Sequence, residues 1–113
     1  MLSATGWWLA LVPVDLRCGI DRLLAKVGGE LGRDARDGGA YVFRNRVGTR
    51  IKVLCLDAQG VWLSTRRLHE GCFHWPRADE AVWSLTPEQF GWLCAGVNWQ
   101  RLSGKLLTLP KSV

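Results

Sequence analysis

Cationic side chains occupy almost all the polar positions of one β-like stretch, YVFRNRVGTRIKVLCLDAQGVWLSTRR, which spans Tyr41–Arg67. Asp57 is its only acidic residue. Guanidinium and ammonium groups bind the oxygens of phosphates and carboxylates, so the stretch predicts a surface that binds a polyanion. The candidate contact residues are Arg44, Arg46, Arg50, Lys52, Arg66 and Arg67.

The whole excess of positive charge comes from the middle of the chain. Residues 1–40 contain five Lys/Arg and five Asp/Glu, and residues 78–113 contain three of each. Residues 41–77 contain seven basic residues against Asp57 and Glu70, which accounts for the net charge of +5. A concentrated charge is typical of a polyanion-binding surface, although a solvated sheet face that keeps the protein soluble is the competing interpretation.

The seven tryptophans are a second group that could bind a partner. Most are expected in the core, because a small domain needs bulky side chains to fill it. Trp62 and Trp99 lie near arginines in the sequence, where an exposed indole could stack on bases or anchor a protein. Packing in the core is the alternative explanation for each of the two. Of the two, only Trp62 joins the six cations as a candidate nucleic-acid-binding residue.

Catalytic and metal-binding patterns are weak. His69, Cys72 and His74 are close together, but no second cluster supplies the fourth ligand that a zinc site usually has. No nucleophile has a neighbouring base, and no glycine loop could cradle a phosphate. A metal-dependent nuclease would have to use Asp57, Glu70, Asp79 and Glu80, which turns and loops also explain. We therefore expect no enzymatic activity, metal or cofactor.

The size and cysteine content predict one domain in the cytoplasm. The 113 residues are 48% hydrophobic and 22% charged, as in ordinary globular proteins. The four cysteines have no CxxC spacing and predict free, mostly buried thiols. The apolar run Trp7–Pro13 is too short to cross a membrane and makes a poor signal peptide. Residues 1–102 are expected to form the domain, and residues 103–113 a C-terminal tail.

Turn signals and hydrophobic periodicity predict the order β-α-β-β-β-β-α. The first helix would be capped by Asp15 and bury a stripe from Leu16 to Leu31. The second would start at Thr86-Pro87-Glu88-Gln89, a capping box with proline at the first helical position. The expected strands are Trp7–Val12, Tyr41–Arg46, Arg50–Asp57, Val61–Leu68 and Cys72–Trp75, with a possible short one at Ala81–Leu85. This order predicts an α+β fold, a mainly antiparallel β-meander sheet with two packing helices.

The length of the first hairpin turn predicts where the cations point. If residues 47–49 form the loop, Arg46 lies opposite Arg50, and Arg44 opposite Lys52. All four would then share one sheet face, as two like-charged pairs that each cost up to about 1 kcal/mol. An anionic partner would remove this repulsion. An edge hairpin whose charges block aggregation is the alternative explanation.

Three spaced segments closely resemble the TnpB accessory protein of bacterial insertion sequences of the IS-sixty-six type. They are PVDLRCGIDRL (Pro13–Leu23), YVFRNRVGTRIKVLCLDAQGVWLSTRRLHEGCFHWP (Tyr41–Pro76) and LTPEQFGWLCAGVNWQRL (Leu85–Leu102). The resemblance covers about Trp8 to Leu102. The departures are local: Cys18 stands where Lys or Ala is more usual, and the Gly32–Gly39 loop lacks the usual Asp-Pro-rich connection.

The resemblance implies a role in transposition beside a separate, larger transposase that carries out strand transfer. It supplies no catalytic residues, and the Arg44–Lys52 cluster falls in the family's F-R-N-R/R-I-K segment. We expect a non-catalytic accessory factor that contacts DNA through the basic hairpin, with the cognate transposase as a second partner. The alternative is an interaction module that docks on the transposase or another accessory subunit through exposed tryptophan and the same cations.

Overall fold

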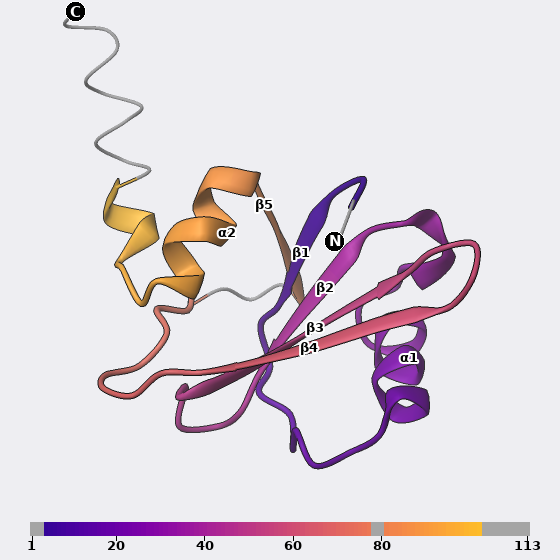
Figure 1. Ribbon diagram of the computed structural model, residues 1–113, viewed down its shortest axis with the longest axis horizontal. Helices are drawn as coiled ribbons and strands as arrows, with labels where there is room; N and C mark the ends of the chain where they lie inside the picture. The colour runs from indigo at the N-terminus through magenta and orange to yellow at the C-terminus, as the bar shows by residue number, and fades with distance from the viewer. Residues whose placement is uncertain (1–3, 78–80, 103–113) are drawn as a thin grey trace, which may run out of the picture.

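Five strands form one sheet, and a helix packs on each of its faces (Figure 1). Residues 4–77 and 81–102 are described here, from a computed structural model. The strands lie in the order β4-β3-β2-β1-β5. Their bounds are β1 Trp7–Ala10, β2 Ala40–Arg44, β3 Arg50–Leu56, β4 Val61–Arg67 and β5 Val82–Leu85. The helices are α1 (Ile20–Gly29), the short 3-10 helix η1 (Ala35–Asp37) and α2 (Pro87–Cys94), and residues 99–102 are also helical.

The apolar run of β2 is buried on both sides because the sheet separates two hydrophobic clusters. Tyr41 and Phe43 pack with Leu23 and Val27 of α1. The intervening Val42 packs on the opposite face with Leu93 of α2 and its neighbours. A central strand covered on both faces is apolar at successive positions, whereas a half-exposed strand alternates.

The sheet is mainly antiparallel, which confirms the predicted α+β class. Strands β2, β3 and β4 form an antiparallel meander, and β5 pairs antiparallel with β1. Strand β1 pairs with β2 in parallel, because α1 and η1 lie in the connection and return the chain to the same end of the sheet. Strand β5 lies within the segment predicted as a short strand at Ala81–Leu85.

Two predicted elements are wrong. Asp15 caps no helix: its carboxylate accepts hydrogen bonds from the backbone and guanidinium N–H groups of Arg17, and α1 begins only at Ile20. Residues 72–75 are not a strand. They are fixed by the Phe73 N–H, which donates to the carbonyl of Gly48 at 2.7 Å, and by the buried Phe73 ring.

The prediction of free, mostly buried cysteines is met in part. All four cysteines are free, but only Cys55 is fully buried. No helix within residues 4–77 and 81–102 is long and apolar enough to cross a membrane. The predicted tail at 103–113 and the carboxylates of Asp79 and Glu80 lie outside the described residues.

The capping box at the start of α2 is present as predicted, and it gives a first test of the fold. Thr86 Oγ1 accepts from the Gln89 backbone N–H at 3.1 Å, and Gln89 Oε1 accepts from the Thr86 N–H at 2.8 Å. Replacing Thr86 by Ala should lower the free energy of unfolding by about 1 kcal/mol in urea titration. Ser84→Ala, an exposed neighbour, should change it by less than about 0.5 kcal/mol. Equal effects would show that the box does not stabilise α2.

Candidate nucleic-acid interface

The hairpin turn between β2 and β3 is one residue longer than predicted. Asn45 pairs with Arg50 through an N–H···O bond of 3.1 Å, so residues 46–49 form the turn. The Asn45 side chain closes it, since its Oδ1 accepts from the N–H groups of Thr49 and Arg50, both at 3.0 Å. Gly48 supplies the positive φ of 77° that the turn requires. Asparagine favours turns because its side chain can bond to nearby backbone groups in this way. Asn45 within FRNR therefore indicates the longer turn, and the predicted three-residue loop did not take it into account.

The longer turn shifts the strand register and separates the cations. Arg44 lies opposite Ile51, and Lys52 lies opposite Phe43. Because cross-strand partners share a face, Arg44 projects toward α2, whereas Arg50 and Lys52 project toward the α1 side. The prediction that Arg44, Arg46, Arg50 and Lys52 share one face is therefore wrong.

Arg44 is occupied by the protein itself. Its guanidinium lies over the Trp75 ring, 5.6 Å from the centroid, and donates to the carbonyl oxygens of Leu11 (3.3 Å) and Arg46 (3.4 Å). Burial lowers the pKa of the Arg44 guanidinium. Its Nε is buried without a hydrogen-bond partner in the described part of the chain. These contacts fix the segment that follows β1 and the Trp75 region to the sheet.

Arg66 also projects toward α2. Its Nε donates to the carbonyl oxygen of Cys94, the last residue of α2, at 2.6 Å. A cation at this end of a helix interacts favourably with the unpaired carbonyls and the helix dipole. Arg66 thus connects the outermost strand to α2.

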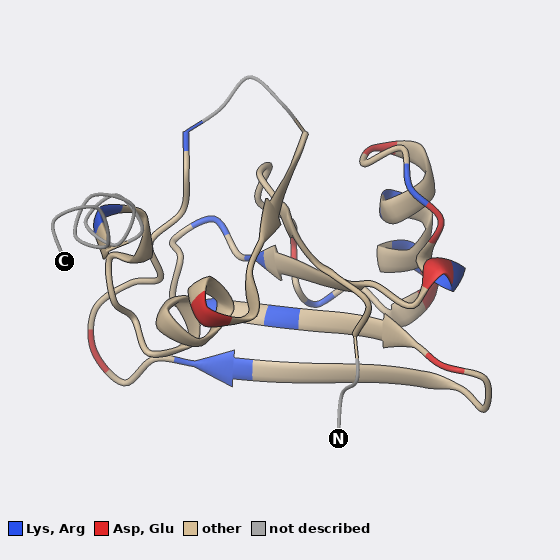
Figure 2. Cartoon of the chain, turned by 90° about the horizontal axis from the view of Figure 1, so that it is seen from above, with Lys and Arg blue, Asp and Glu red and all other residues tan. Residues whose placement is uncertain are grey.

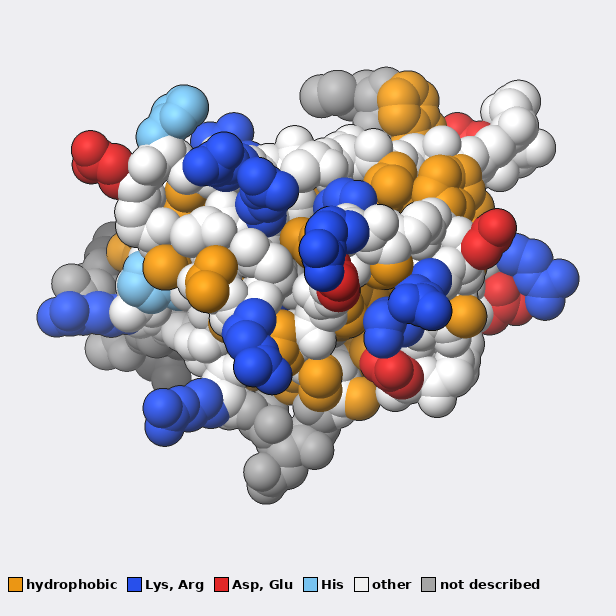
Figure 3. Space-filling view, turned by 90° about the horizontal axis from the view of Figure 1, so that it is seen from below, with side chains coloured by type: hydrophobic (Ala, Val, Ile, Leu, Met, Phe, Trp, Pro, Cys, Tyr) orange, Lys and Arg blue, Asp and Glu red, His pale blue; other side chains and the backbone are white. Residues whose placement is uncertain are grey.

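Three cations remain together on the α1 side, and we call Arg50, Lys52 and Arg67 the basic face. Arg50 lies directly opposite Arg67, and Lys52 lies opposite Thr65. Figure 2 shows these basic segments at the same end of β3 and β4. Figure 3 shows Lys and Arg side chains across the middle of one side of the molecule, with carboxylates both among them and toward its margins.

The basic face has no carboxylate partner among the described residues. The ion pairs found among the described residues involve other cations: they join Arg17 to Asp15, Lys26 to Glu30, Arg33 to Asp37 and Arg36 to Asp34. Beside the basic face lies an open hollow of about 240 Å³, lined by Asp15, Leu16, Arg17, Asn45, Arg50, Lys52 and Thr65. The like-charged pair Arg50–Arg67 is therefore left for solvent or for a partner to neutralise.

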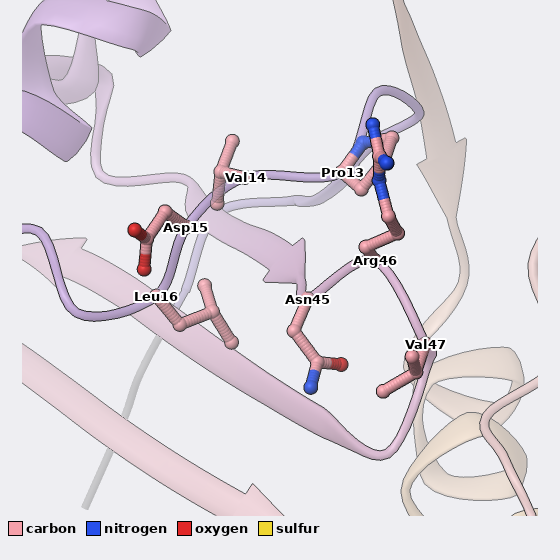
Figure 4. A pocket seen from close by; sticks show the side chains of 7 residues that line it. All are labelled: Pro13, Val14, Asp15, Leu16, Asn45, Arg46 and Val47. Atoms are coloured by element: carbon pink, nitrogen blue, oxygen red, sulfur yellow. The ribbon is translucent and has the colours of Figure 1, made fainter.

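Arg46 stands in the turn, apart from the basic face. It lines a second hollow of about 470 Å³ between the turn and residues 13–16. Figure 4 shows its side chain extending toward Pro13, while the neighbouring Asn45 points away from it. The two hollows share Asp15, Leu16 and Asn45, so Arg46 borders the same concave side of the molecule as Arg50 and Lys52.

The two tryptophans singled out in the sequence have different environments. Trp99 is buried and donates its indole N–H to the carbonyl of His74, so it belongs to the core. Trp62 is 44% exposed, and its indole N–H donates to Asp57 Oδ2 at 2.9 Å. Trp62 lies opposite Cys55 on the α2 side, so the structure does not bring it to the basic face.

No group of three His, Cys, Asp or Glu side chains in residues 4–77 and 81–102 is arranged to hold a metal ion. Cys72 is exposed, and its Sγ donates to the carbonyl oxygen of Val47 at 3.3 Å. The arrangement that can bind a ligand is therefore electrostatic, the basic face with the hollow beside it.

Comparisons with known proteins find one matching family model and two similar proteins in one bacterium. The family model described as IS66 Orf2 like protein matches residues 5–104. The uncharacterized protein y4hO of Sinorhizobium fredii is 38% identical over 93 residues, which cover 82% of this chain and 81% of that protein. The uncharacterized protein y4jC of the same organism is 35% identical over 105 residues, 93% of this chain and 90% of that protein. No solved structure matches.

The different environments of the arginines predict different effects on stability. Arg44→Ala should lower the free energy of unfolding by about 1–3 kcal/mol, because it removes the packing on Trp75 and leaves two carbonyls short of a donor. Arg50→Ala removes an exposed side chain opposite a like charge and should change it by no more than about 0.5 kcal/mol. Urea titration measures both, and an equally large decrease for Arg50→Ala would contradict this division.

Asp57 should make the stability of the hairpin depend on pH. Its carboxyl pKa is held below the ordinary value of 3.8 by three hydrogen bonds, donated by the Gln59 backbone N–H, the Trp62 indole N–H and the Gly60 backbone N–H. The unfolded chain therefore binds this proton more readily. The stabilisation is complete above about pH 4 and is lost as pH falls through the lower, folded-state pKa.

Urea titrations of the native chain and Asp57→Asn from neutral to strongly acidic pH measure this effect. The native chain should be the more stable at pH 7, and the difference should shrink on acidification. A difference that stays constant with pH would show that the carboxylate charge is not responsible.

Proposed function

The chain belongs to the IS66 Orf2-like family, whose role in transposition is accessory, and we propose that it serves this role without catalysis by contacting the DNA backbone. The proposed contacts are the basic face and, at the neighbouring hollow, Arg46. The observation that supports this proposal is the pairing of Arg50 directly against Arg67, with Lys52 beside them and no described carboxylate bonded to any of the three.

The form of the basic face favours phosphate contacts over base recognition. Cations on neighbouring strands present a row of positive charge to a backbone, and such contacts position a protein without reading sequence. Binding would release counterions and depend steeply on salt concentration. Arg44 and Arg66, which belong to the set predicted from the sequence, already donate to carbonyls on the other face of the sheet.

The same surface favours duplex DNA over a single strand. Proteins that hold single strands combine cations with aromatic rings on which bases stack. The residues that line the hollow beside the basic face include no aromatic side chain, and Trp62 is on the opposite side of the sheet. A cytoplasmic location and contact with the cognate transposase are further parts of this proposal.

A second candidate function is docking on the transposase or another accessory subunit. The exposed indoles of Trp62 and Trp83, which are 44% and 38% accessible, support it, because aromatic anchors dominate many protein interfaces. Both tryptophans project from the α2 side of the sheet, since Trp62 faces Cys55 and Trp83 faces Leu9. The two functions would therefore use opposite faces.

Duplex binding across a salt series tests the first proposal. In the triple variant Arg50→Ala, Lys52→Ala and Arg67→Ala, affinity should fall at every salt concentration. The slope of log K against log salt should become less steep by about 0.9 for each phosphate that the variant no longer neutralises, or about 2.7 in total. Affinity for single-stranded DNA should be the lower of the two in the native chain.

A matched control removes the same charge elsewhere. Arg36, Arg77 and Arg101 are exposed and lie outside the hairpin, so replacing them by Ala should reduce the salt slope much less. Equal slopes for the two triple variants would reject the basic face as the contact surface. Absence of DNA binding, together with transposase capture that disappears on Trp62→Ala or Trp83→Ala, would favour the docking function.

A further inference from the structure

We propose that β4 is a dimerisation edge, along which a second copy of this chain pairs antiparallel and extends the sheet. The partner is identified by the self-complementarity of the strand, in its backbone groups and in its charges. The inference does not rest on the proposed contact with DNA, and its test contains no nucleic acid.

The outer edge of β4 is open in the described residues. β4 ends the strand order, and its seven residues pair with β3 continuously, without a bulge or a proline. Natural edge strands are usually short, or carry a bulge, proline or central charge that prevents pairing. In β4 the charges are confined to one end, at Arg66 and Arg67.

The hydrogen-bond pattern shows which backbone groups this edge presents. Asp57 N–H donates to Gly60 O, and Leu68 N–H donates to Thr49 O, at the two ends of the β3–β4 ladder. Hydrogen-bonded pairs alternate along an antiparallel ladder, so the backbone groups of Trp62, Ser64 and Arg66 bond to β3. The backbone groups of the other β4 residues point outward, away from β3. These residues are Val61, Leu63, Thr65 and Arg67.

One two-fold register uses all of these groups. With Ser64 opposite Ser64 of the second copy, Leu63 pairs with Thr65 and Val61 pairs with Arg67. All four are outward-pointing residues, so each pair can exchange both backbone hydrogen bonds. All seven residues of β4 are then paired.

The side chains in this register are complementary in charge. Arg66 of each copy lies opposite Trp62 of the other, on the same face of the joined sheet. The indole of Trp62 is bonded to the carboxylate of Asp57, the only acid in residues 41–67. While its Nε stays bonded to the Cys94 carbonyl, the guanidinium of Arg66 would therefore meet an aromatic ring with an anion at its edge. Sliding the strands until Arg66 faces Arg66 would instead oppose like charges, which disfavours that register, and the register centred on Ser64 is the one that pairs all four outward-pointing residues.

Proline at position 65 tests the edge without removing a bond within the monomer. The Thr65 N–H points outward, so Thr65→Pro removes a donor only from the dimer, and proline is tolerated where an edge N–H faces solvent. Light scattering on a sizing column should give a dimer for the native chain, twice the monomer mass of 12.6 kDa. Thr65→Pro should weaken dimerisation by about a hundredfold, because two interfacial bonds are removed, whereas Thr65→Val should not.

Cysteine cross-linking tests the register independently and remains informative if the proline variant fails to fold. In a chain carrying Cys18→Ser and Cys72→Ser, Ser64→Cys should form an intermolecular disulfide on oxidation with diamide. Its Cα atoms would lie about 4.5 Å apart, within the range for a disulfide. Thr65→Cys should not cross-link, because its two copies would lie more than about 7 Å apart, offset along the strand.

The outcomes separate clearly. A dimer that requires the Thr65 N–H and cross-links through position 64 supports the proposal. A native chain that stays monomeric up to its solubility limit would overturn it. So would a dimer that a folded Thr65→Pro variant forms with unchanged affinity, or equal cross-linking through positions 64 and 65.

Discussion

The side chain of Asn45 decides on which face of the sheet the cations of the β2–β3 hairpin lie. Its Oδ1 accepts hydrogen bonds from the backbone N–H groups of Thr49 and Arg50, and these bonds close a β2–β3 turn of four residues. Because side chains alternate along a strand, one residue of turn length decides which face each cation occupies. The turn thus places Arg44 against Trp75 and leaves Arg50 and Lys52 on the other side.

A sheet covered on both faces makes this separation useful. A cation that projects toward α2 meets carbonyls and aromatic rings, and Arg44 and Arg66 both bind there. On the α1 side, Arg50 and Lys52 instead border an open hollow that they share with residues 15–17. The same residue type therefore stabilises the fold on one face and remains available to a partner on the other.

Much of the fold could be predicted because its signals are local. The capping box at Thr86, the turn at Asp57 and the apolar run of β1 each depend on a few neighbouring residues. The site could not be derived in the same way. The face on which each cation lies depends on the length of the turn, which Asn45 and Gly48 determine and which the alternation of residues along the strands does not reveal. The environment of Arg44 depends on Trp75, which is distant in sequence.

The basic face and the edge of β4 are coupled by geometry. An antiparallel pairing about a two-fold axis keeps each face of the sheet continuous, so the basic faces of two copies would lie on the same side. Arg67 of each copy would be separated along the strand direction by about 20 Å, the rise of six residues. A dimer would thus present two groups of cations to one anionic surface, doubling the phosphate contacts without adding a charge to either chain. Neutralisation of Arg50 and Arg67 by that surface would also remove their repulsion, so that binding and the stability of the β3–β4 hairpin would favour one another.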